Sequence, residues 1–106
     1  MGKILIIGGY GDVGKVVVTE LLSRSNKQLM IGGRQALKAE EFLLTVDASR
    51  VSFKLIDIYE KITYLDELKD IRMVIMCLSP RTIDFAAYCL KNGIYYLDIS
   101  ASGQTM

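Results

Sequence analysis

Short apolar runs alternate with amphipathic segments from one end of the chain to the other. Five runs are nearly continuous in apolar side chains: residues 3–7, 28–34, 51–56, 73–78 and 94–99. This pattern predicts strands buried on both faces of a sheet. The first helix is expected to end near Arg24, a second to span residues 35–46, and a short third to carry Ile62, Leu65 and Leu68. Such alternation favours parallel pairing with right-handed crossovers.

The last expected helix has marked ends. Ser79 suits an N-cap, Pro80 suits the first helical position, and Gly93 follows the last turn. Four residues between them recur at helical spacing and predict the buried stripe: Ile83, Ala86, Ala87 and Leu90.

A glycine cluster joins the first strand to the first helix, in the segment Gly8-Gly9-Tyr10-Gly11-Asp12-Val13-Gly14. Two dinucleotide fingerprints fit it, GxGxxG from Gly9 and GxxGxxG from Gly8, and the spacing does not separate them. The phosphate-loop pattern GxxxxGK also fits from Gly9. Val16, however, stands where a Ser or Thr would hold magnesium, which excludes that loop.

Glycines suit this turn for physical reasons. Gly9 permits a sharp exit from the strand, and Gly11 lets the backbone approach a pyrophosphate. Gly14 brings the helix close to the strand. The helix N-terminus then points unpaired N–H groups at the anion. We therefore predict a cofactor-binding loop made of Gly9, Tyr10, Gly11, Asp12, Val13 and Gly14. A glycine turn with a purely structural role is the alternative.

The end of the second strand indicates which dinucleotide binds. NAD-preferring folds place an Asp or Glu about 20 residues beyond the glycines, where it binds the ribose 2′-hydroxyl. That position holds Arg34, preceded by Gly33, and no carboxylate occurs between Glu20 and Glu40. Because a guanidinium suits phosphate oxygens, NADP(H) is favoured as the cofactor, while NAD(H) is still compatible. The alternative is a solvated arginine at a strand end.

The ends of the later strands add further candidates, since ligands of doubly wound sheets bind beyond the carboxyl ends of the strands. Asp57 and Ile58 follow the third strand, Leu78 and Ser79 the fourth, and Ser100 the fifth. Asp57 could accept a hydrogen bond from the adenine amino group or serve only as a turn carboxylate. Ser79 could reach the nicotinamide-side ribose or serve only as a helix cap.

Composition narrows the function further. The chain has 106 residues and a formal charge of +1, which fits one domain and gives no reason to expect nucleic acid or an acidic membrane as a partner. No apolar run is long enough for a membrane span or fits a signal peptide, so a cytoplasmic protein is expected. Cys77 and Cys89 are expected to be buried, reduced thiols. Because the chain has no histidine, we expect no metal site and find no obvious general base.

Four segments together are similar to one family: the glycine segment, Ile31-Gly32-Gly33-Arg34, Cys77-Leu78-Ser79-Pro80 and, most specific, residues 87–100. They resemble the NADP-binding domain of saccharopine dehydrogenase-like oxidoreductases. The resemblance implies a doubly wound, Rossmann-type α/β fold with a parallel sheet of about five strands, in the order 3-2-1-4-5. It also implies hydride transfer to a substrate that is held mainly by a C-terminal domain.

Residues 1–106 are therefore expected to form one dinucleotide-binding domain, with the substrate domain absent from this chain. No catalytic residue is assigned, and the fragment is not expected to be active alone. An exposed sheet edge could favour a homodimer.

Two other functions share this fold. One is a short-chain dehydrogenase or NmrA-like NADP-binding protein. Short-chain chemistry would require a Tyr-x-x-x-Lys pair, which none of the six tyrosines forms. The other is a non-catalytic dinucleotide-sensing regulatory domain, which would share the glycine turn and the strands. Such domains usually carry an acidic residue where this chain has Arg34.

Overall fold

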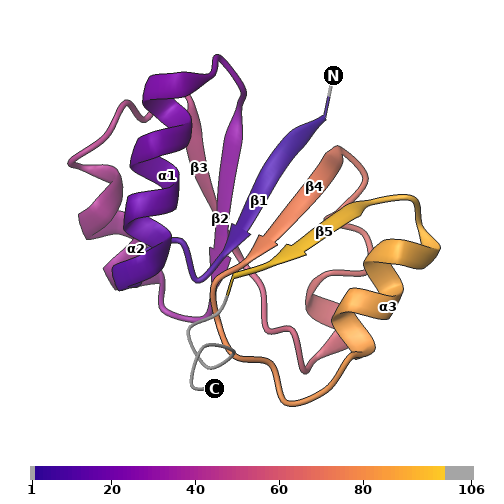
Figure 1. Ribbon diagram of the computed structural model, residues 1–106. Coiled ribbons are helices and arrows are strands. Elements are labelled where there is room, and N and C mark those ends of the chain that lie inside the picture. The colour runs from indigo at the N-terminus through magenta and orange to yellow at the C-terminus, as the bar shows by residue number, and fades with distance from the viewer. Residues whose placement is uncertain (1, 100–106) are drawn as a thin grey trace, which may run out of the picture.

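The computed structural model, which describes residues 2–99, contains one five-stranded parallel sheet. Its strands follow the predicted apolar runs: β1 Lys3–Ile7, β2 Leu29–Gly33, β3 Val51–Leu55, β4 Ile71–Met76 and β5 Tyr95–Asp98. They lie in the order β3-β2-β1-β4-β5, which confirms the predicted arrangement (Figure 1). Ser100, expected just beyond the fifth strand, lies outside the described residues.

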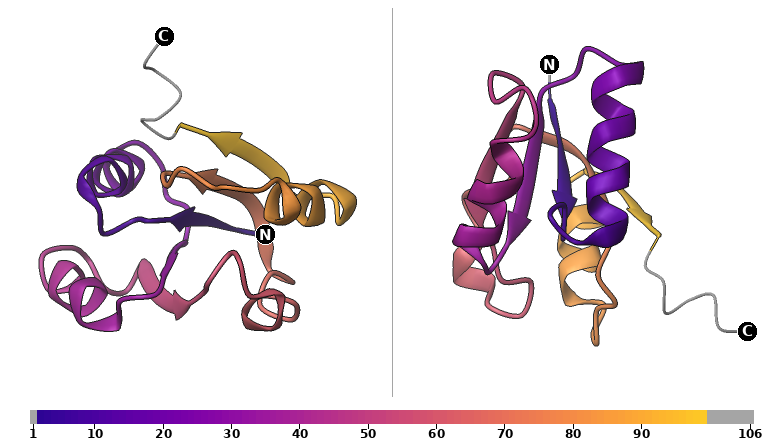
Figure 2. Two further views of the ribbon diagram at one scale, coloured as in Figure 1. Left: turned by 90° about the horizontal axis from the view of Figure 1, so that it is seen from below. Right: turned by 90° about the vertical axis from the view of Figure 1, so that its left-hand side faces the viewer.

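Helices cover both faces of the sheet. One face carries α1 Asp12–Arg24 and α2 Ala36–Leu43, and the other carries α3 Asp84–Lys91 and the short 3-10 helix η1 Lys61–Thr63 (Figure 2). The second helix is thus shorter than the predicted span of 35–46, because residues 44–46 form turns after it.

Alternate residues of β1 divide between two apolar cores. Ile6 packs in the cluster that contains Val18 of α1, whereas Leu5 and Ile7 pack in the cluster that contains Phe85 of α3. All three strand residues are 0% exposed, as expected of a central parallel strand with helices on both sides. The sheet therefore holds β1 rigidly up to the point where the glycine segment begins.

The start of α3 differs from its prediction. Ser79 and Pro80 do not open the helix, which begins only at Asp84. In the loop before it, the Arg81 N–H donates to the Tyr59 hydroxyl at 3.0 Å, and the Arg81 guanidinium lies 4.2 Å from the centroid of the same ring. We attribute the late start to this contact, because the loop must reach Tyr59 before the helix can begin.

The buried face of α3 also differs from its prediction. Ile83 and Leu90 are 77% and 65% exposed, while Phe85 and Cys89 are buried. The Phe85 ring packs edge-on against Tyr64, with ring centroids 4.8 Å apart. The large apolar area of the aromatic ring decides which stripe faces the sheet.

The short helix expected around Ile62 and Leu68 is reduced to η1 followed by turns. The Thr63 hydroxyl is bonded to both the backbone N–H and the carbonyl of Asp57, so the segment is held at the end of β3. Leu68 is buried as expected, but Ile62 is 79% exposed. Side-chain bonding to the backbone has here replaced a longer helix.

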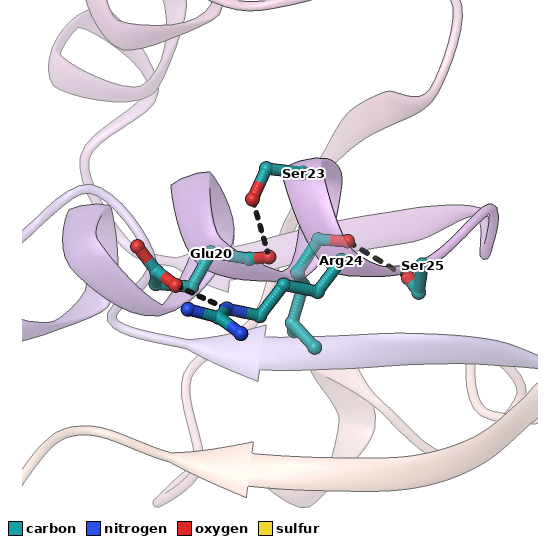
Figure 3. A network of polar contacts seen from close by, with 5 residues as sticks. Glu20, Ser23, Arg24 and Ser25 are labelled. Carbon is teal, nitrogen blue, oxygen red and sulfur yellow. Dashed lines mark hydrogen bonds and ion pairs between the residues drawn. The ribbon is translucent and has the colours of Figure 1, made fainter.

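The last turn of α1 carries an exposed polar network (Figure 3). Arg24 pairs with Glu20, one turn earlier on the helix, and both side chains are more than half exposed. Nearby, the Ser25 hydroxyl donates to the Leu21 carbonyl at 2.8 Å. The serine bond satisfies one carbonyl of the helix end and is partly buried, whereas the ion pair lies in solvent.

A second arginine, Arg50, binds backbone carbonyls at the end of α1 and in the loop that leads to β2. Arg50 precedes β3, and its guanidinium donates to the carbonyls of Leu22, Ser25 and Lys27 at 2.9, 2.7 and 2.9 Å. Its positive charge also stands at the negative end of the α1 dipole. Arg50 thus connects the end of α1 to the two strands of the β2–β3 edge.

We expect Arg50→Met to lower the free energy of unfolding by about 2 kcal/mol, because three carbonyls lose a charged donor. Arg24→Met is the matched control and should cost about 0.5 kcal/mol or less, since its ion pair is exposed. Urea denaturation of both variants measures the difference. Equal losses would show that Arg50 does not hold this loop.

Candidate functional site

The strand order reverses between β1 and β4, and the carboxyl ends of the strands meet at one edge of the sheet. Ligands of doubly wound sheets bind at this point. A cleft of about 140 Å³ opens there, lined by Ile7, Gly8, Tyr10, Gly11, Gly33, Arg34, Gln35, Ile56, Asp57, Ile58, Tyr59 and Leu78. Sites for drug-sized ligands typically measure about 300–1,000 Å³, so this cleft can hold only part of a dinucleotide.

The turn after β1 brings the N-terminus of α1 to this edge. Gly8 has a φ of +81°, which glycine adopts without steric cost, and its carbonyl accepts the Gly11 N–H at 2.9 Å. The helix then begins at Asp12 with Gly11 as its N-cap, and no side chain caps it. The unpaired N–H groups of the first turn and the positive end of the helix dipole are therefore available to an anion.

The three glycines of the fingerprint serve different purposes. A Cβ on Gly14 would lie 2.6 Å from the Gly9 Cα, and a Cβ on Gly9 would lie 2.9 Å from the Ile31 Cβ, so packing requires both glycines. Gly11 differs, because the nearest atom to its added Cβ would be the Gly8 carbonyl oxygen at 3.3 Å. Its backbone, with φ −83° and ψ 179°, suits any residue. A Cβ at position 11 would therefore make one tight contact with a backbone oxygen, whereas at positions 9 and 14 it would collide with its neighbours.

The end of β2 lies beside the glycine turn. The Tyr10 ring covers Gly33, where an added Cβ would lie 2.7 Å from the ring atom Cζ, and the Tyr10 hydroxyl accepts the Gln35 N–H at 2.9 Å. Arg34 stands between these two contact points and is exposed. Its side chain has no hydrogen bond or ion pair to any other residue in the described range 2–99. The guanidinium is therefore open to a ligand.

The end of β3 forms another wall of the cleft. One carboxylate oxygen of Asp57 accepts the Tyr59 N–H at 2.9 Å, an arrangement typical of a turn carboxylate. Ile58 is only 6% exposed and belongs to the core on the α3 side of the sheet. The geometry thus supports the turn interpretation of Asp57, while an adenine contact stays a prediction.

The cleft brings some of the sequence-predicted residues together and leaves others outside. Seven predicted residues line it: Tyr10, Gly11, Gly33, Arg34, Asp57, Ile58 and Leu78. Five do not: Gly9, Asp12, Val13, Gly14 and Ser79. Gly9 and Gly14 are buried beneath the turn, whereas Asp12 and Val13 are exposed on the first turn of α1.

Five lining residues are absent from the sequence prediction: Ile7, Gly8, Gln35, Ile56 and Tyr59. Ile7 is the last residue of β1, and Ile56 directly follows β3. The rule that ligands bind at the carboxyl ends of the strands would have indicated both, had it been applied one residue earlier in each strand. Gln35 and Tyr59 carry no such signal, since residues distant in sequence place them: Tyr10 accepts the backbone N–H of Gln35, and Arg81 contacts the hydroxyl and ring of Tyr59.

Both cysteines are free thiols, Cys89 buried and Cys77 partly buried. Burial raises the pKa of Cys89 to about 11, and burial together with the charge of Asp98 raises the pKa of Cys77 to about 11. Each thiol is therefore protonated at neutral pH and is a poor nucleophile. The predicted burial is thus confirmed for Cys89, whereas Cys77 is only partly buried.

The described residues contain neither a candidate metal cluster nor a helix that could span a membrane. Within residues 2–99, no group of three or more His, Cys, Asp or Glu side chains could hold a metal ion. In the same range, every helix is too short or too polar to cross a membrane.

A parallel sheet in this order, a glycine turn leading into a helix N-terminus and a cleft at the switch point define a Rossmann-type dinucleotide-binding domain. The family described as saccharopine dehydrogenase NADP binding domain matches residues 4–105, and the chain belongs to this family. The match confirms the resemblance seen in the sequence and, at the level of the family, the expected cofactor NADP(H). A comparison with curated protein sequences found no match.

Solved structures share this fold at low sequence identity. They include Pen from Bacillus thuringiensis (TM-score 0.66, 19% identity), a short-chain dehydrogenase/reductase from Veillonella parvula (0.68, 18%) and AtPrR2, which was solved with NADP+ and (+)pinoresinol (0.69, 15%). The matches cover 87%, 94% and 90% of this chain but only 29%, 47% and 35% of those structures, in the same order. The chain thus spans less than half the length of the structures it resembles.

Thiol reactivity tests the raised pKa values. In the folded protein, alkylation of the partly buried Cys77 by iodoacetamide should accelerate about ten-fold per pH unit from about pH 8 to pH 10, because only the thiolate reacts and its pKa lies at about 11, above the usual 9.0. Cys89 is 0% exposed, so it should react only when the fold opens. In urea the rate should level off just above pH 9. Peptide mass spectrometry measures each site separately.

The same shift predicts that stability depends on pH. The folded state keeps both thiol protons between about pH 9 and 11, whereas the unfolded state releases them, so the free energy of unfolding should decrease across this range. Alkylation of the folded protein that levels off near pH 9 would contradict both expectations.

Proposed function

We propose that this domain binds NADP(H) along the carboxyl edge of its sheet and presents the nicotinamide for hydride transfer to a substrate held mainly by protein outside this chain. In this arrangement the adenosine half occupies the cleft and the pyrophosphate lies against the N-terminus of α1. The nicotinamide half extends past the end of β4, towards Leu78 and Ser79.

The observation that carries this proposal is that packing restricts Gly11 much less than it restricts Gly9 and Gly14, although Gly11 faces the cleft. Gly9 and Gly14 are explained by packing, but no neighbouring side chain occupies the position of a Cβ at Gly11. This residue lines the cleft and is the N-cap of α1, where the helix offers N–H groups to an anion. A pyrophosphate that lies against the backbone gives glycine a function at this position.

Arg34 supports the choice of NADP(H) over NAD(H). Its side chain is unpaired within residues 2–99 and lines the same cleft as Gly11. A guanidinium can bind the 2′-phosphate with paired hydrogen bonds, and a neutral 2′-hydroxyl gains much less from this charge.

The groups that complete the reaction are proposed to come from outside this chain. NADPH, when bound, supplies a hydride, but substrate binding and proton transfer need further polar groups. This chain has no histidine and no Tyr-x-x-x-Lys pair, and both of its thiols stay protonated at neutral pH. The domain is therefore proposed to supply cofactor binding alone.

Gly11→Val tests the pyrophosphate position. The native φ and ψ suit valine, but valine is a poorer N-cap residue than glycine and its Cβ would press on the Gly8 carbonyl oxygen, so the free energy of unfolding should fall by about 1 kcal/mol. NADPH binding, measured by calorimetry, should weaken beyond detection because the side chain fills the space in front of the helix N-terminus.

Gly14→Ala is the contrasting variant. Its Cβ would collide with the turn, so it should lower the free energy of unfolding by about 1–3 kcal/mol through overpacking. Normal NADPH binding by Gly11→Val would show that the glycine turn is only structural.

Arg34→Gln tests the cofactor preference. The dissociation constant for NADPH should rise about ten- to a hundred-fold, because a charge-assisted contact to the phosphate is lost. That for NADH should change by less than about two-fold, since the 2′-hydroxyl makes little use of the charge. Arg24→Gln, at the far end of α1, is the matched control. If the unaltered domain binds NADH as tightly as NADPH, the role assigned to Arg34 is wrong.

A further inference from the structure

We propose that Tyr10 is a positioning residue that gives the site its preference for a 2′-phosphate, because it fixes the backbone on both sides of Arg34. The inference rests on the proposed function and deepens it. It assigns to the one aromatic residue of the glycine segment a task distinct from that of the glycines around it.

The geometry joins two loops that are far apart in the sequence. Tyr10 belongs to the turn after β1, yet its ring lies on Gly33 and its hydroxyl accepts the Gln35 N–H at 2.9 Å. Ring and hydroxyl therefore contact the residue before Arg34 and the residue after it. The ring is also tilted against Phe53 of β3, with centroids 6.3 Å apart, which limits its movement.

Gly33 is adapted to this contact. An added Cβ at this position would lie 2.7 Å from both Cζ and Cε2 of the Tyr10 ring, a distance that real Cβ atoms do not tolerate. The absence of a side chain at the end of β2 thus lets the tyrosine from the neighbouring loop lie flat on the backbone.

Arg34 needs such support because nothing else in the described chain holds it. Its guanidinium has no hydrogen bond or ion pair within residues 2–99, and a long side chain loses considerable rotamer entropy when it orders on a ligand. Fixing the backbone beforehand leaves these rotamers free, but it removes the separate cost of ordering the backbone and keeps Arg34 at the edge of the cleft. We expect this to strengthen binding of the 2′-phosphate, which Arg34 would contact. The pyrophosphate would gain nothing, because it would lie against α1 instead.

Tyr10→Phe removes the hydroxyl and keeps the ring over Gly33. The Gln35 N–H is exposed, so water can replace the lost partner and the fold should be retained. We expect the dissociation constants of NADPH and of 2′,5′-ADP to rise about three- to ten-fold, as the loss of one hydrogen bond implies. Those of NADH and 5′-AMP should change by less than about two-fold.

A double-mutant cycle separates positioning from direct contact. In the Arg34→Gln background, Tyr10→Phe should no longer affect NADPH binding, because the group that it positions is missing. Amide hydrogen exchange at Gln35 should accelerate in Tyr10→Phe even without cofactor. Tyr88→Phe is the matched control, since its hydroxyl also joins two segments, through the Leu65 carbonyl at 2.8 Å, but stands away from the cleft.

The outcomes are distinguishable. Suppose that the unaltered domain prefers NADPH, and that Tyr10→Phe leaves the ratio of the NADPH and NADH dissociation constants unchanged, whether or not both constants rise. The positioning role is then overturned, and the proposed function stands. If the unaltered domain binds neither NADPH nor 2′,5′-ADP, the proposed function fails, and the positioning role fails with it because there is no preference to set.

Discussion

The close approach of α1 to the turn after β1 is the constraint on which the rest of this structure depends. At Gly14 a side chain would overlap the Gly9 backbone, so only glycine lets the helix come this near. That approach places the N-terminus of α1 at the carboxyl edge of the sheet and leaves Gly11 exposed. It also places Tyr10 against the end of β2, where its hydroxyl accepts the Gln35 N–H. Packing inside the domain and the proposed anion site at its edge thus depend on one contact.

Two tyrosines give the edge its shape. Tyr10 joins the first loop to the end of β2, and Tyr59 joins the end of β3 to the Arg81 loop, each by accepting a backbone N–H. Loops at a sheet edge are usually its more mobile part, and contacts of this kind limit their movement without filling the cleft. The cofactor would therefore meet loops that are already in place, which lowers the entropy lost on binding.

The positive charge at the carboxyl edge of the sheet suits ligand binding, whereas the two thiols of the chain are too weakly ionised to act as nucleophiles. The Arg34 side chain is an unpaired cation within residues 2–99, and α1 directs the positive end of its dipole at the same edge, as the proposed phosphate contacts require. The raised pKa values of Cys77 and Cys89 keep both thiols neutral. Family membership gives the chain its fold and cofactor class.

The sequence by itself determined the strands, their parallel pairing and the glycine turn, because apolar runs and glycine spacing are local signals of burial and close approach. The strand order and the cofactor class followed from the resemblance of its motifs to a family, with Arg34 favouring NADP(H). Only the tertiary structure decided that α3 begins at Asp84 instead of Pro80 and buries Phe85 instead of Ile83, since contacts with Tyr59 and Tyr64 outweigh local capping and periodicity. It likewise separated Gly11 from the packed glycines and placed the Gln35 backbone at the cleft. Distances between segments remote in sequence fix such features, and no local pattern records them.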